Sequence, residues 1–464
     1  MKKSVALFYA AVFAVCAVLC AGAVQPLTDS QFIYSNASYK IMERNGLYYI
    51  PEGAGYGVGI FGVNEPNAGV STSHDALISL CKLLSFEQNG VELFDVRILA
   101  AVYCFFLFTG LLLVLFGAFS ENRWWTNLLL LCLLALVFFD YSYLRYFSSF
   151  FVQPFLMLLI LNIFGLWYCM FRCQSLILRF YIPYLCLMLL LLTSFEPFAV
   201  VCVLLLSLFG FSMWGYCKGS FKKWLLVVSL TVIFMSSMTL CFENRFYNYE
   251  ENLYCSVFQG VFLSGGSAAD LGLDSSLDQL KGTFYSSKNA RDYSLLENFY
   301  SKTDYWDVVG FYLKNPKSLF SMLALSANNA FNINLPIQGE QNSIRSEFFP
   351  LRTELYSFLK SKFAPNTLYF VLMFGLVFVY AAVLICNYNI RRGGRRGIVG
   401  ILICKFILYI SALVCTPIFT GVYLIGFNNF MFYFIFDVVF VTSVIGEIRY
   451  MLDRREHIKN DYGV

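Results

Sequence analysis

The sequence predicts an all-α polytopic membrane protein of about ten transmembrane helices. Of its 464 residues, 59% are hydrophobic and only 13% are charged, and the mean hydropathy is +0.65. A soluble domain carries about 25% charged residues, so a soluble chain of this composition could not cover its surface with polar groups. Apolar runs of roughly 20 residues, the length that crosses a bilayer as helix, recur along the chain.

Ten apolar runs are the predicted spans. In chain order they cover residues 4–24, 98–119, 124–139, 151–171, 180–194, 198–216, 224–242, 366–387, 398–415 and 428–447. The third and fifth runs are short for a full crossing, so we expect little tilt or a partly re-entrant path. The first run follows two lysines and also fits a cleavable secretory signal. We expect it to be retained, because it is long for a signal.

The distribution of Lys and Arg predicts the orientation. Alternate short loops and the termini together hold sixteen of these residues, whereas the opposite short loops hold only Arg145. Cytoplasmic loops carry the excess of positive charge, so we expect both termini on the cytoplasmic side of the membrane. The predicted organisation is a first transmembrane helix (1–24), a first outer loop with interfacial helices (25–97), a six-helix transmembrane region (98–242), an outer soluble segment (243–365), a three-helix transmembrane region (366–447) and a cytoplasmic tail (448–464).

The two outer segments carry local patterns. Residues 34–49 suggest a short interfacial helix, and the glycine-rich stretch 53–62 is expected to be a flexible or extended loop because no Gly-Lys-Ser/Thr follows it. Residues 76–86 place their leucines on one face, which predicts an amphipathic helix along the membrane surface. In the second segment, residues 305–313 and 318–331 favour two helices separated by an Asn-Pro break. The cytoplasmic loops are too short for a nucleotide-binding domain.

Ionisable residues next to apolar runs are the candidate functional groups. The densest cluster lies between the third and fourth predicted spans, from Asp140 to Pro154. Its rings could stack on a sugar or form an aromatic belt, and Arg145 could grip a phosphate. The spans hold almost no charge apart from Lys405, which disfavours an ion-coupled transporter. With only two histidines in the chain, a histidine-built metal or catalytic site is nearly excluded.

Four stretches of the chain carry a family resemblance. They run from Tyr39 to Tyr49, from Phe94 to Leu99, from Asp140 to Pro154, and in pieces from Tyr254 to Ala330. With these stretches the chain resembles bacterial membrane glycosyltransferases of the GT-C class and, more closely, the WsfD-like hexose transferases of glycan biosynthesis. The resemblance implies a GT-C-like bundle and an outer-face enzyme. It also implies a polyprenyl-phosphate-linked sugar as donor, an envelope glycan as acceptor, and a catalytic carboxylate in the first outer loop.

Two positions depart from the pattern of that class. Ala37 stands where relatives have Asp, and Gln153 stands where they often have Glu. The base is therefore expected at Asp29 or Asp75. An inverting transfer needs such a base for the acceptor hydroxyl and positive charge for the departing phosphate. The predicted site residues are, as catalytic acids, Asp29, Asp75, Asp140 and Glu196, and, for substrate binding, Arg145, Arg245, Tyr143, Tyr146 and Gln153.

Other functions stay open at this point. A lipid-linked glycan polymerase or ligase would fit the large late outer segment but does not explain the long first outer loop. A catalytically degenerate glycolipid-binding protein would fit the two lost acids, and a transporter is a further alternative. A divalent cation, Mg²⁺ or Mn²⁺, could assist the phosphate. The lipid bilayer is an expected partner, and nucleic acid is not.

Overall fold

The computed structural model describes most of the chain between residues 41 and 444. The described residues are 41–50, 60–64, 72–118, 124–173, 176–217, 219–283, 285, 293–331, 355–391, 397–423 and 425–444. They form two compact units. The first contains the described residues up to Ser194 together with residues 355–359, and the second contains the others from Phe195 onward.

The first unit contains a four-stranded antiparallel sheet. Its strands, in the order β1-β2-β4-β3, are β1 (Leu47–Tyr49), β2 (Ile60–Val63), β3 (Phe86–Gln88) and β4 (Val91–Asp95). The prediction of an all-α protein is therefore wrong in this region. Asn89 and Gly90 join β3 to β4 with φ of 54° and 76°, as a two-residue hairpin turn requires, and Asn-Gly is a strong sequence signal for such a turn.

The end of the glycine-rich stretch is a strand rather than a loop. Residues 60–62 belong to β2, and Gly62 pairs with Tyr48 of β1. A Cβ on Gly62 would lie 2.0 Å from the Tyr48 ring, so only glycine lets the ring cover the sheet there. Residues 53–59 lie outside the described part of the chain.

An amphipathic helix is present in the segment predicted as the first outer loop, but its limits differ from the prediction. Helix α4 covers Ser73–Lys82, and Leu80 on it is exposed, as are Leu83 and Leu84 just after its end. The helix begins earlier than predicted because Thr72 caps it. It ends earlier because β3 begins at Phe86. Its contact with the membrane stays a prediction.

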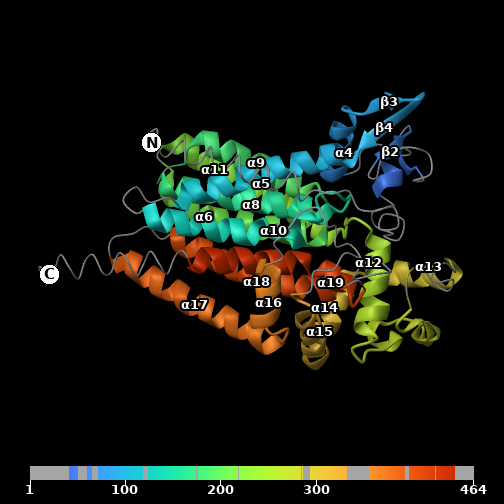
Figure 1. Ribbon diagram of the computed structural model, residues 1–464. Coiled ribbons are helices and arrows are strands. Elements are labelled where there is room, and N and C mark those ends of the chain that lie inside the picture. Colours follow the sequence, from blue (N-terminus) through green and yellow to red (C-terminus); the bar gives the residue numbers. More distant parts are fainter. Residues whose placement is uncertain are drawn as a thin grey trace, which may run out of the picture. The chain divides into compact units, whose positions relative to one another are not determined.

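Apolar helices form the rest of the first unit. They are α5 (Val96–Ala118), α6 (Trp124–Phe138), the one-turn α7 (Tyr141–Leu144), α8 (Val152–Arg172) and α9 (Leu178–Leu192). Figure 1 shows α5 and α8 side by side, with the sheet at the end of α5 where β4 leads into it. Gly165 permits this close approach, because a Cβ there would lie 2.6 Å from Leu113 Cβ. Small residues serve the same purpose in other membrane helix pairs.

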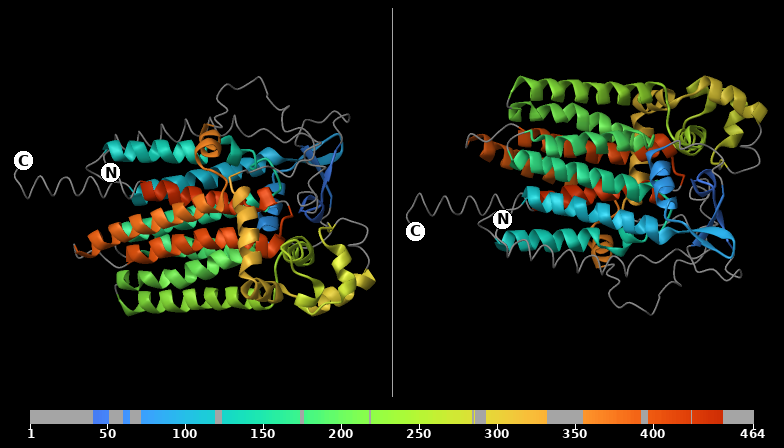
Figure 2. Two further views of the ribbon diagram at one scale, coloured as in Figure 1. Left: turned by 90° about the horizontal axis from the view of Figure 1, so that it is seen from below. Right: turned by 90° about the horizontal axis from the view of Figure 1, so that it is seen from above.

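The second unit is helical throughout its described residues. Its helices are α10 (Pro197–Gly210), η2 (Phe211–Tyr216), α11 (Ser220–Phe242), α12 (Tyr249–Ser256), the π-helix η3 (Val257–Val261), η4 (Ala268–Leu271), η5 (Ser275–Leu280), α13 (Tyr293–Lys302), α14 (Tyr305–Lys314), α15 (Pro316–Asn328), the end of α16 (Leu355–Phe363), α17 (Leu368–Arg391), α18 (Gly397–Thr420), α19 (Ile425–Asn428) and a last helix, Phe430–Val444. Figure 2 shows the pairs α10 and α11, and α17 and α18, running side by side. The predicted break at Asn315 and Pro316 is confirmed, since Pro316 begins α15.

The chain is a mostly helical membrane protein with five to six candidate spans. Within the described residues, five helices are long and apolar enough to cross a bilayer, and the bent pair of α16 and α17 would make a sixth. Three further apolar helices are shorter: Asn127–Phe138, Leu178–Leu192 and Phe430–Val444. These helices match nine of the ten predicted runs in position, and the run 4–24 lies outside the described residues. The count of ten and the orientation stay predictions.

Candidate functional site

Asp75 lies in the first turn of α4 and forms a capping box with Thr72. The Asp75 backbone N–H donates to Thr72 Oγ1 at 3.1 Å. Asp75 Oδ2 accepts from the Thr72 N–H at 3.1 Å and from the Thr72 hydroxyl at 2.7 Å. Such reciprocal pairing satisfies backbone donors that a helix start leaves open. Thr followed three residues later by an acid, before an apolar run, is a sequence signal for it.

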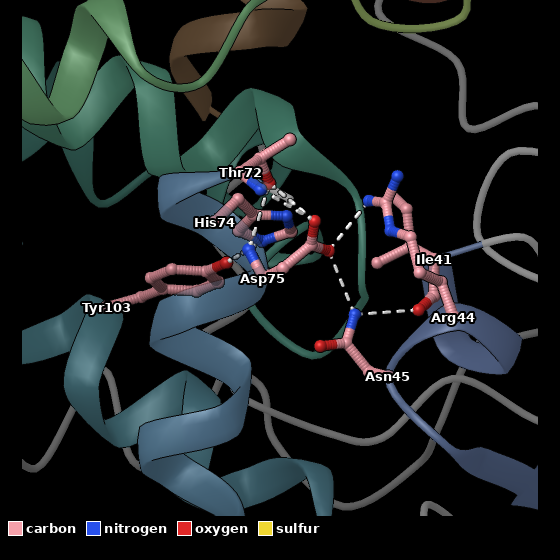
Figure 3. Close-up of polar contacts among 7 residues, drawn as sticks. All are labelled: Ile41, Arg44, Asn45, Thr72, His74, Asp75 and Tyr103. Atoms are coloured by element: carbon pink, nitrogen blue, oxygen red, sulfur yellow. Dashed lines mark hydrogen bonds and ion pairs between the residues drawn. The ribbon is translucent and has the colours of Figure 1, made fainter. Parts of the chain in front are cut away.

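The other oxygen of Asp75 binds the segment that precedes β1 (Figure 3). Asp75 Oδ1 accepts from Arg44 Nη2 at 2.7 Å and from Asn45 Nδ2 at 2.9 Å. A carboxylate has about four lone-pair sites, so these contacts and those of Thr72 fill its acceptor capacity. Burial alone would raise the pKa of Asp75. The hydrogen bonds from Asn45 and Thr72 and the charge of Arg44 outweigh it and hold the pKa below its ordinary value.

This environment favours a positioning role for Asp75. Its ionised form is stabilised and its lone pairs are occupied, which makes it a weak acceptor for a further proton. The contacts fix residues 44–45 against α4, and Lys82 adds to them by donating from Nζ to the Asn45 carbonyl at 2.5 Å. The sequence did not identify Arg44 or Asn45 as part of the site. The role of Asp75 as the base stays a prediction.

His74 is the buried neighbour of Asp75. Its Nε2 lies 2.9 Å from the hydroxyl oxygen of Tyr103 on α5. Burial lowers the pKa of His74 to about 4, against the opposing effect of the Asp75 charge, so the ring is neutral at pH 7. The neutral ring packs against Phe155 of α8, with ring centres 5.4 Å apart, and so helps to pack α4 against α5 and α8.

Asp140 is the second acid of this unit and caps α7. Its Oδ1 accepts from the Ser142 N–H at 2.9 Å, and its Oδ2 accepts from the Ser357 N–H, in the first turn of α16, at 3.0 Å. Both donors are backbone groups, and Asp140 itself is buried. Each carboxylate oxygen can accept about two hydrogen bonds, so within the described residues each oxygen keeps one open acceptor position.

Arg145 and the two tyrosines follow Asp140 in the same loop. Arg145 ends α7, and its guanidinium lies 5.6 Å from the centre of the Tyr146 ring. Burial raises the pKa of Tyr146 despite the opposing effect of the Arg145 charge. Tyr143 and Tyr146 are fully buried, and Tyr143 contacts Phe138 with ring centres 6.1 Å apart. Their present packing is structural, and their contact with a sugar stays a prediction.

Two polar atoms near Arg145 in sequence are buried without a partner. Among the described residues, nothing lies within hydrogen-bond distance of Ser142 Oγ or of Gln153 Oε1. Gln153 is the second residue of α8, the helix that contains a candidate span. Buried polar atoms are normally paired, so these two atoms are the best available positions for a ligand hydroxyl or a water molecule.

Aromatic contacts join the surroundings of the two acids within the first unit. Tyr103, the partner of His74, contacts Phe147 with ring centres 5.7 Å apart. Phe61 of β2 contacts Phe150 at 5.1 Å. The sheet, the start of α5 and the loop before α8 therefore pack together. These contacts link the surroundings of Asp75 to the loop that holds Asp140 and Arg145, which the sequence could not show.

The remaining predicted residues belong to the second unit or lie outside the described residues. Glu196 caps α10 and Arg245 follows α11, and both belong to the second unit. Arg245 Nε pairs with Glu243 Oε2 at 2.7 Å, but both side chains are largely exposed, and exposed pairs contribute little. Asp29 and Ala37 lie outside the described residues.

The second unit contains a buried ion pair that the sequence reading missed. Lys360 Nζ lies 2.5 Å from Asp437 Oδ1, and the two side chains are 3% and 0% exposed. The ammonium also lies 3.1 Å from the centre of the Tyr433 ring, 4.6 Å from Phe436 and 5.0 Å from Phe331. Asp437, in the middle of the apolar run 428–447, was the available signal, because buried charge in a span is costly and is kept for a reason.

The expectation that the spans carry almost no charge apart from Lys405 is corrected by this pair. Lys405 is itself buried, and its Nζ donates to Thr442 Oγ1 at 2.8 Å. Among its described residues, the interior of the second unit therefore holds two buried lysines and one buried aspartate. The two lysines contact side chains of the last helix, Phe430–Val444.

The family comparison decides the membership of the chain. A family model described as the YfdI N-terminal transmembrane domain matches residues 10–462. The chain belongs to this family. The family and the candidate spans agree that it is a multi-pass membrane protein. Neither curated proteins nor solved structures yield a match. The family description names no activity, so a glycosyltransferase function is a proposal.

Proposed function

We propose that the protein is a glycosyltransferase that moves a hexose from a polyprenyl-phosphate donor to a cell-envelope glycan at the outer face of the membrane. One observation carries the proposal. Within the described residues Asp140 keeps an open acceptor position on each oxygen, and Arg145 lies in the same loop, just before a candidate span. A carboxylate and a guanidinium at the end of a membrane helix suit a donor with a lipid tail and a phosphate. The resemblance to the GT-C class supports the same function.

In the proposed reaction Asp140 is the base. It accepts the proton of the acceptor hydroxyl, the acceptor oxygen bonds to C1 of the hexose, and the bond between C1 and the phosphate oxygen breaks. Polyprenyl phosphate leaves with the bonding electron pair, and Arg145 meets its charge through paired hydrogen bonds. Asp75 acts as a positioning residue, by fixing Arg44 and Asn45 against α4.

A divalent cation is not needed for this assignment. Within the described residues no group of three or more His, Cys, Asp or Glu side chains could hold a metal ion. The acceptor positions of Asp75 are already taken by hydrogen-bond donors. The described donor set does not fit a bound Mg²⁺ or Mn²⁺, and no step is assigned to one.

The test is a comparison of matched acid variants in a transfer assay. Asp140→Asn keeps the size of the side chain but removes the base, and we expect a loss of about 10²- to 10⁴-fold in transfer. Arg145→Gln removes the charge that meets the phosphate and should also lower transfer. Glu297→Gln changes an exposed acid on α13 and should leave the rate unchanged. Transfer that is unaffected by both Asp140→Asn and Arg145→Gln would refute the assignment.

A second function is favoured by one observation. Gln153 stands where related enzymes often carry Glu, and its buried Oε1 has no partner among the described residues. A protein with this substitution could bind a glycolipid without turning it over. Binding of polyprenyl-phosphate hexose that is retained in Asp140→Asn, with no transfer by the unmodified protein, would support that alternative.

A further inference from the structure

Helix α14 has two apolar faces. One face is buried against the second unit and includes Tyr305, Val308 and Tyr312. Trp306 and Leu313 lie seven residues apart, nearly two full turns, so they share the other side of the helix, where they are 47% and 75% exposed. Large apolar side chains gathered on one exposed helix face mark a membrane or partner surface. The Trp306–Leu313 face is therefore a surface that lacks its cover among the described residues.

The space over this face is open. Gly310 lies between Trp306 and Leu313 on the same side of α14. A Cβ added to Gly310 would meet no atom of the described residues within 4 Å. The exposed face is thus continuous along the helix, and no described loop folds over its middle.

The start of this face lies at the end of a candidate membrane span. The Trp306 ring stacks on Phe242, with ring centres 5.4 Å apart and planes inclined by 24°. Phe242 is the last residue of α11, whose whole length, Ser220–Phe242, is apolar enough to cross a bilayer. The end of such a span lies at the boundary of the hydrocarbon core, and tryptophan prefers that boundary.

Charged residues beyond the helix agree with this location. Lys314 ends α14 and Lys317 lies in the first turn of α15, and both are exposed. Long cationic side chains at such a position reach the headgroup region while their stems stay apolar. Asp304 and Asp307 at the other end are held in a capping box, so their carboxylates serve the start of the helix.

We propose that α14 is an interfacial membrane helix whose Trp306–Leu313 face inserts into the bilayer at the end of α11. The occupant of this face is phospholipid, because the face continues a span that is itself a lipid-facing element: Met235 and Phe242 of α11 are exposed in the same way. The proposal is independent of the glycosyltransferase assignment. Its consequence is that α14 and the segment around it are held at the membrane surface.

Photo-crosslinking of the full-length protein tests this directly. A diazirine amino acid is placed at position 313 of protein reconstituted in phosphatidylethanolamine and phosphatidylglycerol vesicles, and lipid adducts are measured by mass spectrometry. Position 235, in the middle of α11, is the lipid-facing reference, and position 274, exposed in a polar segment, is the water-facing reference. We expect adducts at position 313 within about twofold of those at position 235, as for a face buried at the acyl boundary. Adducts at the level of position 274, or crosslinks to a second copy or another protein, would overturn the proposal.

Tryptophan fluorescence provides a second readout that needs no label. The contribution of Trp306 is the difference between the unmodified protein and Trp306→Phe in the same vesicles. Lipids brominated near the headgroup should quench this difference signal more strongly than lipids brominated near the chain end. A Trp306 signal that no brominated lipid quenches would contradict insertion, even if the diazirine variant folds poorly.

Discussion

Removing either partner of the Lys360–Asp437 pair should strongly destabilise the protein. Breaking a buried ion pair from one side leaves an uncompensated charge and costs about 3–5 kcal/mol. The two losses should differ. Asp437→Asn leaves the ammonium among three aromatic rings, each able to contribute about 0.5–2 kcal/mol. Lys360→Met removes the ammonium that lies beside the buried Asp437 carboxylate, so its loss should be the larger.

The double variant decides whether the effect belongs to the pair. Replacing a buried ion pair by apolar residues is often neutral or stabilising. Lys360→Met combined with Asp437→Leu should therefore be more stable than Lys360→Met or Asp437→Leu alone, and these three variants close a double-mutant cycle with a coupling energy of about 3 kcal/mol. The exposed Lys362 of the same helix supplies the matched control, Lys362→Met, which should change stability by less than about 0.5 kcal/mol.

Thermal unfolding in nanodiscs at one scan rate measures these differences. A loss of 3 kcal/mol corresponds to an apparent Tm shift on the order of 6–12 °C, at 2–4 °C per kcal/mol. We expect shifts of this size for Lys360→Met and smaller shifts for Asp437→Asn. Single variants no less stable than Lys362→Met would refute the reasoning. So would a double variant whose loss equals the sum of the single losses.

Three further predictions concern the first unit, with one glycine of the second unit as a comparison. Because the pKa of His74 is lowered from 6.5 to about 4 in the folded protein, the unfolded chain binds the proton more tightly, and stability is lost as pH falls below 6.5. We expect the free energy of unfolding, measured at each pH, to fall by about 2 kcal/mol between pH 7 and pH 5, and this loss to be absent in His74→Gln. Gly165→Ala should destabilise the protein by about 1–3 kcal/mol through overpacking against α5, whereas Gly310→Ala, which meets open space beside α14, should stabilise it by about 0.5–1 kcal/mol. Tm shifts of the same sign for the two variants would contradict the packing. Asp75→Asn should cost about 2–3 kcal/mol, since it removes charged hydrogen bonds, and should speed hydrogen exchange at residues 41–45; unchanged exchange would contradict its positioning role.

The apolar runs made the helices predictable. Long stretches such as Val96–Ala118 and Gly397–Thr420 satisfy their backbone within the helix and need no partner to be recognised. The break before Pro316 was equally local, since proline cannot continue a helix but begins one well. The sheet was missed because its strands have only three to five residues. Only the Asn-Gly turn at 89–90 carried a local signal for it.

The site was predictable residue by residue but not as an arrangement. Asp75 and Asp140 were identified from their position at membrane boundaries. The partners that set their chemistry are distant in sequence: Arg44 lies 31 residues from Asp75, and Ser357 lies 217 residues from Asp140. Asp437 was visible within the apolar run 428–447, but its pairing with Lys360, 77 residues away, was not. Such contacts are products of packing, and no local pattern encodes them.

Sugar transfer by the purified full-length protein is the measurement that tests the proposed function most directly. The protein would be given labelled polyprenyl-phosphate hexoses, with crude envelope glycan as acceptor, and assayed beside Asp140→Asn. We predict labelled glycan from at least one donor, with transfer lost in the variant by about 10²-fold or more. No transfer, from protein that is folded and binds the donors, would contradict the assignment and leave glycolipid binding without turnover as the function.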